Sequence, residues 1–214
     1  MRDYLKSSYR LTQAGGTLTV TALAEARRVA PASATAMIKK LVALGLMDHR
    51  HYGEVTLTPE GTRQALLAIR RHRLLECFLV RMLGFGLDEV HDESHSLEPA
   101  ISERLEERID QALGHPKRCP HGDPIPDVNG RMDHDPGFPL IQLEENVEAT
   151  VLRVPGSKRD LLRHLIELGV EPEKPICVVK REPFGGSLHL RLGRRVVLLS
   201  QEAASTIYVA REAG

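Results

Sequence analysis

The sequence contains no tryptophan, and only 4% of its 214 residues are aromatic. Its apolar fraction of 42% is still that of a globular protein, so we expect cores built from Leu, Val, Ala and Ile. No apolar run approaches the roughly 18 to 20 residues that span a bilayer, and the first residues lack the apolar stretch of a secretion signal. These absences predict a protein of the cytoplasm with no membrane partner. The length predicts two or three small units.

Cysteine is scarce as well. The three cysteines, Cys77, Cys119 and Cys177, are too few and too scattered for a disulfide framework, and none belongs to a CxxC pair. We therefore expect reduced thiols in a reducing compartment.

The chain has no net charge, but its charges are segregated along the sequence. Residues 1–73 carry 12 basic and 5 acidic side chains, residues 74–150 carry 6 and 17, and residues 151–214 carry 11 and 7. A basic first third fits a polyanion such as DNA, and an acidic middle third fits a cation such as a metal ion. Chance segregation of solvated charges is the alternative.

Residues 1–57 have the pattern of a winged helix-turn-helix. A first helix is predicted before Gly15-Gly16, and a second is predicted to start at the N-cap Thr21 and to bury Leu23, Ala26 and Val29. The third helix, ASATAMIKKLVAL, should bury Ala34, Ile38 and Leu41. Two short strands between Leu46 and Leu57 then predict a hairpin, the wing.

The outward face of the third helix is small and polar, so the helix can lie close to the major groove of DNA. Ser33 and Thr35 can bond phosphate oxygens or base edges, while Ala32 and Ala36 can make van der Waals contacts. The basic residues suit phosphates better: Arg27, Arg28, Lys39, Lys40 and Arg50. A tri-helical scaffold for protein contact is the alternative.

Two later helices carry His and carboxylate side chains in register. The first is predicted to run from Thr58-Pro59-Glu60 to about Met82. The second is a helical segment predicted from about Asp88 to Gly114, kinked or divided at Pro99. The candidate ligands of each helix lie on one face of it: His72 and Glu76 on the first helix, and His91, His95 and Glu98 on the second. Imidazole and carboxylate without thiolate suit Mn(II), Fe(II), Co(II) or Zn(II).

The second helical segment also carries an apolar stripe at every fourth position: Leu97, Ile101, Leu105, Ile109 and Leu113. This stripe needs a partner, either a second copy of the chain or an intramolecular surface. The Pro- and Gly-rich stretch that follows predicts a loop and linker to about Gly137. Its His115, Cys119 and His121 are interpreted as loop packing, because no second cluster nearby completes four metal ligands.

From Phe138 the chain has short β-branched runs, VEATVLRV, PICVVKRE, LHLRL, RVVLLS and TIYVA, with one helix at Arg159–Leu168. These runs predict a small β-barrel. The fold class is therefore mainly α with small β, in three domains: a winged helix-turn-helix at residues 1–73, a helical metal-binding and dimerisation domain at 74–137, and a barrel at 138–214.

The winged helix followed by RRHRLLECFL, HDESHSLE and CPHGDPIP resembles the diphtheria toxin repressor family of iron- and manganese-dependent regulators. The last segment resembles the SH3-like barrel of FeoA-type proteins. The resemblance covers nearly the whole chain. It implies a homodimer that, when loaded with metal, binds pseudo-palindromic operators in double-stranded DNA and represses genes of metal uptake.

By position, the resemblance implies one metal site at His72, Glu76 and His91 and a second, regulatory site at Asp3, His95 and Glu98. The sequence departs from the family at Pro99, where a His ligand is usual, which puts the strength of the regulatory site in doubt. Asp3 and His95 replace the softer Met and Cys of iron sensors, so Mn(II) is preferred, with Fe(II) close behind and Zn(II) or Co(II) able to bind in vitro. Ser157 to Leu161 offer no convincing further ligands.

The sequence thus predicts a metal-activated transcriptional repressor that controls metal homeostasis, and not an enzyme. One alternative is a DNA-binding regulator whose metal site is purely structural. The other is a metal-dependent hydrolase, although no nucleophile or phosphate-binding loop is apparent.

Overall fold

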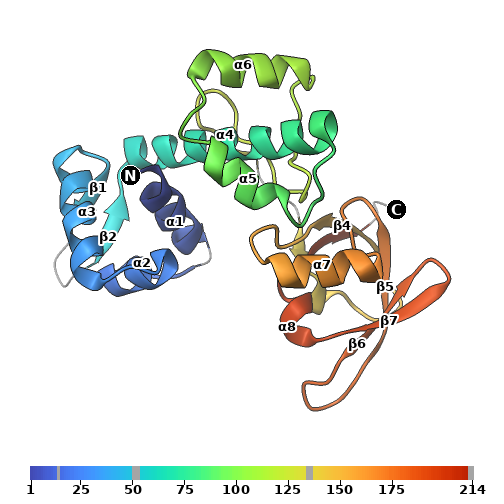
Figure 1. Cartoon of the computed structure of the whole chain (residues 1–214). Coiled ribbons are helices and arrows are strands. Elements are labelled where there is room, and N and C mark those ends of the chain that lie inside the picture. The colour runs from blue at the N-terminus through green and yellow to red at the C-terminus, as the bar shows by residue number, and fades with distance from the viewer. Residues whose placement is uncertain (14, 50–53, 134–136, 212–214) are drawn as a thin grey trace. The chain divides into compact units, whose positions relative to one another are not determined.

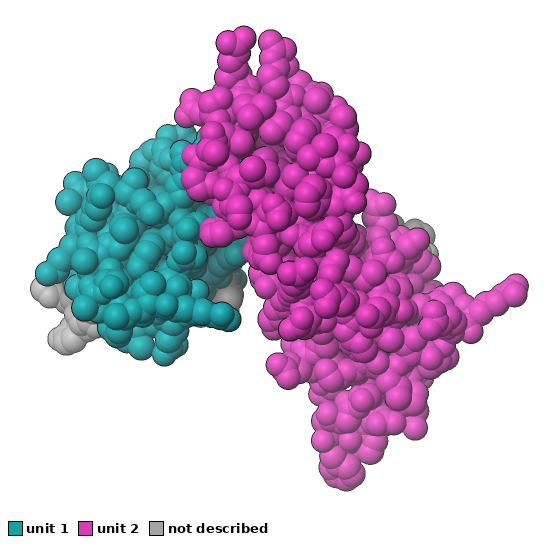
Figure 2. Space-filling view, in the orientation of Figure 1, with its two compact units in different colours: residues 1–72, 125–133 teal, residues 73–124, 134–214 magenta. Residues whose placement is uncertain are grey.

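The computed structural model describes residues 1–13, 15–49, 54–133 and 137–211. The chain forms two compact units, which Figure 2 distinguishes by colour. Unit 1 comprises residues 1–72 and 125–133, and unit 2 comprises residues 73–124 and 134–214. The division into three domains at residues 73 and 137 stays a prediction.

Unit 1 begins with three helices, α1 (Arg2–Gln13), α2 (Val20–Arg27) and α3 (Pro31–Ala43). The hydroxyl of Thr19 caps α2 by accepting a hydrogen bond from the Ala22 backbone N–H at 3.1 Å. The prediction that Thr21 caps this helix is wrong, because Thr19 has the extended backbone of an N-cap and Thr21 lies inside the helix.

The predicted buried stripe of α2 is wrong in part. Leu23 is buried as expected, but Ala26 is exposed and Ala24 is buried in its place. Val29 lies beyond the last helical residue, Arg27, and is also exposed. The helix ends before Val29, and its buried side chains, Leu23 and Ala24, come from a single turn.

The core of unit 1 is formed by α1, α2, α3 and a two-stranded sheet, together with Ala65 of the helix that follows the sheet. Ala34, Ile38 and Leu41 of α3 are at most 2% exposed, as predicted. Strand β1 (Met47–His49) pairs antiparallel with β2 (Val55–Leu57). The predicted helix-turn-helix and the strands of its wing are confirmed; the wing tip lies outside the described residues.

Helix α4 (Pro59–Leu83) begins in unit 1 and continues as one helix into unit 2 (Figure 1). The Thr58 hydroxyl accepts a hydrogen bond from the Gly61 N–H at 2.9 Å, so the predicted Thr-Pro start is confirmed. Gly61 is required because a Cβ there would lie 1.8 Å from the Leu46 carbonyl oxygen. Within the described residues, no helix combines the length and the apolar character needed to cross a membrane.

Unit 2 contains the second half of α4 and two shorter helices, α5 (Val90–Leu97) and α6 (Glu103–Ala112). Pro99 lies between α5 and α6, so the segment is divided there, as predicted. The Ser102 hydroxyl caps α6 by accepting a hydrogen bond from the Leu105 N–H at 3.2 Å. α5 is therefore a separate helix that holds His91 and His95, with Glu98 at its C-cap.

The C-terminal part of unit 2 is a six-stranded antiparallel sheet of strand order β3-β8-β4-β5-β6-β7. Helix α7 lies beside this sheet (Figure 1). Its Leu162 and Leu165 are buried in the core that the sheet forms. The five predicted β-runs and the helix are confirmed, whereas the shortest elements, β3, the 3₁₀ helix η2 and α8, were missed. In chain order the elements are β3 (Phe138–Pro139), η2 (Leu140–Gln142), β4 (Glu148–Arg153), α7 (Arg159–Leu168), β5 (Pro175–Arg181), β6 (Leu188–Leu192), β7 (Arg195–Leu199), α8 (Gln201–Ala204) and β8 (Tyr208–Arg211).

Candidate metal centre and nucleic-acid interface

One face of α4 carries two buried polar side chains, one helical turn apart. His72 is 4% exposed and Glu76 is 3% exposed, which is rare for side chains that can be charged. A buried carboxylate is costly unless it is paired, hydrogen-bonded or bound to a cation. The spacing of four residues predicted this shared face, and the single helix α4 confirms it.

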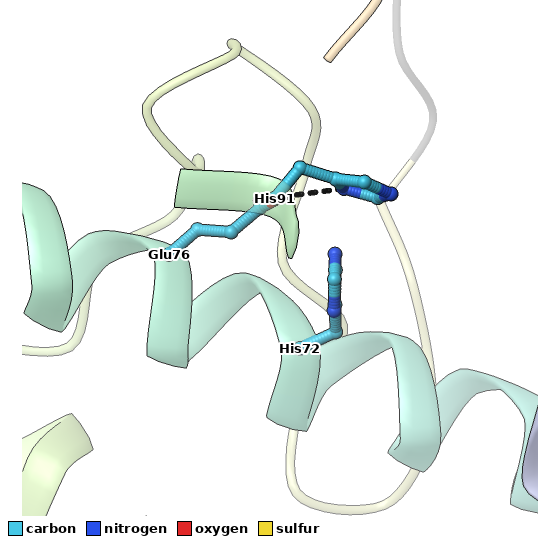
Figure 3. A group of neighbouring side chains, drawn as sticks. All are labelled: His72, Glu76 and His91. Atoms are coloured by element: carbon cyan, nitrogen blue, oxygen red, sulfur yellow. Dashed lines mark hydrogen bonds and ion pairs between the residues drawn. The ribbon is translucent and has the colours of Figure 1, made fainter. Parts of the chain in front are cut away.

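Helix α5 adds His91 to this pair (Figure 3). The Nδ1 atom of His91 lies 3.2 Å from Oε1 of Glu76, and His91, Glu76 and His72 each offer a ligand atom within 4.8 Å of the others. Two imidazole nitrogens and one carboxylate oxygen are a donor set that suits divalent Mn, Fe, Co or Zn. The three residues thus offer a donor set that fits a metal ion, and their role as ligands stays a prediction.

The loop after α6 brings a second set of donors to Glu76. Cys119 and His121 are both buried, and with Glu76 they again place one ligand atom each within 4.8 Å of the others. Sequence reasoning missed this group because it searched the loop for a complete cluster, whereas the third donor lies on α4. The buried loop does pack, as expected, but its Cys and His side chains also meet a carboxylate.

Burial and the Glu76 carboxylate together shift the pKa values of these two loop residues. Burial alone would lower the pKa of His121, but its hydrogen bond to Glu76, the Glu76 charge and a bond to the Leu87 carbonyl outweigh burial and raise that pKa. Burial, together with the charges of Glu76 and Asp123, raises the pKa of the Cys119 thiol well above its usual range. A cation beside Glu76 would favour the opposite states, neutral imidazole and thiolate, because ligands bind deprotonated.

His121 is held in place by the C-terminal part of unit 2. Its Nε2 atom lies 2.9 Å from the Leu87 carbonyl oxygen, and its own carbonyl accepts a hydrogen bond from the Val154 N–H at 2.9 Å. Gly156, in the turn between β4 and α7, packs so closely that a Cβ there would lie 2.6 Å from the imidazole ring. Leu87 and the turn between β4 and α7 thus fix the position of a candidate ligand.

The residues of the expected regulatory site lie in different parts of the chain. His95 is exposed on α5 and Glu98, its C-cap residue, is 3% exposed, both in unit 2. Asp3 is in α1 of unit 1, where its carboxylate contacts Lys6 and Arg27. The joining of Asp3, His95 and Glu98 at one ion stays a prediction.

The predicted DNA-contacting face of α3 is accessible. Ala32, Ser33 and Ala36 are exposed, and Thr35 is half-buried with its hydroxyl donating to the Pro31 carbonyl at 2.9 Å. Lys39 and Lys40 are exposed on the same helix, and Arg28 is exposed at the end of α2. Arg27, in contrast, is ion-paired with Asp3, and Arg50 lies outside the described residues.

Comparison with known proteins gives three consecutive matches along the chain. Residues 1–55 match the iron dependent repressor N-terminal DNA binding domain, residues 58–127 match the iron dependent repressor metal binding and dimerisation domain, and residues 138–211 match the FeoA domain. The iron-dependent repressor IdeR of Mycobacterium tuberculosis is 30% identical, and the alignment covers 96% of this chain and 94% of that protein. The chain belongs to the iron-dependent repressor family. The resemblance to diphtheria toxin repressors and to FeoA proteins is thereby confirmed.

Solved structures of related repressors share this family member's fold. A manganese-dependent transcriptional repressor in complex with manganese has a TM-score of 0.91 and 38% identity, over 98% of this chain and 99% of that chain. The ScaR protein with bound Cd²⁺ has a TM-score of 0.87 and 32% identity, over 98% of each chain. Over a shorter region, the regulator MntR of Lysinibacillus sphaericus is 34% identical, covering 51% of this chain and 78% of that protein. The relatives thus include both iron- and manganese-dependent repressors.

Proposed function

We propose that this family member is a repressor that binds its operator in the cytoplasm when Mn(II), or alternatively Fe(II), occupies its His and carboxylate sites. The observation that carries the proposal is the convergence of the His72 and His91 imidazoles on the buried carboxylate of Glu76. Family membership supports DNA binding and repression, and it argues against the hydrolase alternative.

The preference for Mn(II) rests on donor chemistry. By the sequence resemblance, Asp3 and His95 occupy the positions of the Met and Cys ligands of iron sensors. They are harder ligands than Met and Cys, and hard oxygen and imidazole donors suit Mn(II) and Fe(II). Zn(II) and Co(II) are expected to bind in vitro as well, because the affinity order favours Zn(II) over Mn(II). One similar solved structure is a manganese-dependent transcriptional repressor in complex with manganese, which supports this preference.

The regulatory step is assigned to Asp3, His95 and Glu98. An ion that joined α1 to α5 would tie the DNA-binding helices to the metal-binding helices, so metal and DNA affinities would be linked. Pro99 stands where a further His ligand is usual, so we expect water or a neighbouring oxygen to complete the site. The bases would be contacted by α3, and phosphates by Arg28, Lys39, Lys40 and the wing.

We further propose a homodimer, with the apolar side chains Leu97 and Leu105 at its interface. These residues are 40% and 47% exposed, whereas Ile109 of the same stripe is only 5% exposed within the chain. The stripe is thus divided between an internal and an external partner. We also infer that the C-terminal sheet closes into an SH3-like barrel, which the FeoA match supports.

The test is binding of a DNA fragment from upstream of the gene itself, titrated with Mn(II), Fe(II) and Zn(II). Metal should raise the DNA affinity of the wild type by a factor of about 5 to 150, a typical allosteric coupling. His95→Ala should abolish this gain, and Ser96→Ala, an exposed neighbour on α5, should keep it. Metal-independent DNA binding that His95→Ala leaves unchanged would favour the regulator with a structural metal site.

A further inference from the structure

The carboxylate of Asp3 is already engaged by two cations of its own unit. The Nζ atom of Lys6 lies 3.2 Å from Oδ1, and the Nη2 atom of Arg27 lies 3.2 Å from Oδ2. Lys6 is on the same helix three residues later, and Arg27 comes from the end of α2. Each oxygen of this proposed metal ligand therefore has a cationic neighbour.

Both cations are largely withdrawn from water. The side chain of Lys6 is 8% exposed and that of Arg27 is 29% exposed. The Arg27 guanidinium lies 5.8 Å from the centre of the Tyr4 ring, and its Nε atom is buried, with no hydrogen-bond partner among the described residues. The Asp3 carboxylate offsets part of the cost of burying these two cations, because burial of a charge without compensation is costly.

We propose that Lys6 and Arg27 act as internal competitors of the metal ion at Asp3 and so set the metal concentration at which the repressor is activated. The inference rests on the proposed function, in which Asp3 is a ligand of the regulatory ion. A divalent ion bound about 2 Å from a carboxylate oxygen lies within a few ångströms of both nitrogen atoms, which repel it. Metal binding therefore displaces Arg27, Lys6 or both from Asp3.

The identity of Arg27 connects this competition to DNA. Arg27 is at the end of α2, the first helix of the helix-turn-helix, and its guanidinium is a strong phosphate donor. When the ion takes Asp3, Arg27 loses its carboxylate partner and gains from a phosphate in its place. One displaced side chain thus transmits metal occupancy to the DNA-binding surface without a large rearrangement.

The experiment measures Mn(II) binding to the full-length protein without DNA, following free Mn(II) by electron paramagnetic resonance. The class of sites lost in Asp3→Asn identifies the regulatory ion. Lys6→Met keeps the aliphatic stem and removes the charge, so it should raise the Mn(II) affinity of that class roughly three- to tenfold. Arg27→Gln should raise it similarly. The charge-conserving Lys6→Arg and the neighbouring Arg28→Gln should leave it within about twofold of wild type.

A second readout separates Arg27 from Lys6. At saturating Mn(II), Arg27→Gln should weaken DNA binding and reduce the salt dependence by about two released counterions per dimer, while Lys6→Met should change neither. Unchanged or weaker Mn(II) binding in Lys6→Met and Arg27→Gln, with Asp3→Asn still losing the site, would overturn the competition alone. Retention of both site classes in Asp3→Asn would overturn the regulatory site together with the competition. Melting curves identify any variant that fails to fold, and the other variant then decides.

Discussion

Glu76 lies at the centre of the candidate ligands of unit 2. One oxygen, Oε1, lies 3.2 Å from Nδ1 of His91 and 3.4 Å from Nδ1 of His121. Glu76 also belongs to two groups of candidate ligands, one with His72 and His91 and the other with Cys119 and His121. Because Glu76 contributes to the raised pKa of His121, a proton on this imidazole is stabilised beside the carboxylate. A metal ion bound by these groups would compete with that proton.

This exchange predicts how the stability of the metal-free protein depends on pH. Because the pKa of His121 is higher in the folded than in the unfolded chain, the stabilising effect is complete below the unfolded value of about 6.5. It is lost as the pH rises through the folded pKa. We expect the free energy of unfolding in chelator, measured with urea, to fall from pH 6 to pH 8.

The matched variant is His121→Gln, which cannot be protonated and should flatten this pH dependence. The Mn(II) affinity of the wild type should change in the opposite direction and rise with pH over the same range, because the ion must displace the proton on His121. Parallel stability curves for wild type and His121→Gln would contradict the assignment of the proton to His121.

At the scale of elements, the turn between β4 and α7 is the support of the candidate ligand loop. Gly122 approaches β4 so closely that a Cβ would lie 1.8 Å from the Leu152 carbonyl oxygen, and Gly156 approaches His121 in the same way. Arg153 of β4 lies 3.8 Å from Asp123 of the loop. Strand β4 and the turn after it thus help to position the loop of the candidate metal centre, although they offer none of its candidate ligand atoms.

Gly156→Ala tests this support. The added methyl group would push against the His121 ring, so we expect a loss of about 1–3 kcal/mol in stability. We also expect weaker metal binding by the group of Glu76, Cys119 and His121. Ser157→Ala, at an exposed neighbouring position, serves as the control. The measurements are urea unfolding and Mn(II) titration; wild-type values for Gly156→Ala in both would show that the turn does not position His121.

The sequence was sufficient to predict elements that rest on long periodic patterns or strong caps. Spacing of four residues placed His72 and Glu76 on one face, and Thr58-Pro59 marked the start of α4. Thr19 and Thr21 are both good N-caps, so local preference could not choose between them. The contact between the loop residues Cys119 and His121 and Glu76 depends on tertiary packing. Such a contact has no periodic pattern in the sequence, so it could not be predicted from the spacing of these residues.

At the scale of the whole molecule, the segregated charges and the three consecutive family matches agree. A basic first third coincides with the DNA binding match, and an acidic middle third overlaps the metal binding and dimerisation match. The proposed dimer would present two copies of α3, which is the arrangement that a pseudo-palindromic operator requires. Function then depends on linkage between metal occupancy and DNA affinity.

The most direct test of this linkage measures both halves of the thermodynamic cycle with the wild-type protein. The DNA affinity is determined with chelator and with saturating Mn(II), and the Mn(II) affinity is determined with and without operator DNA, at one pH and salt concentration. Linkage requires that operator DNA raise Mn(II) affinity by the factor by which Mn(II) raises DNA affinity, about 5 to 150 overall. Equal Mn(II) affinity with and without DNA would contradict a metal-activated repressor.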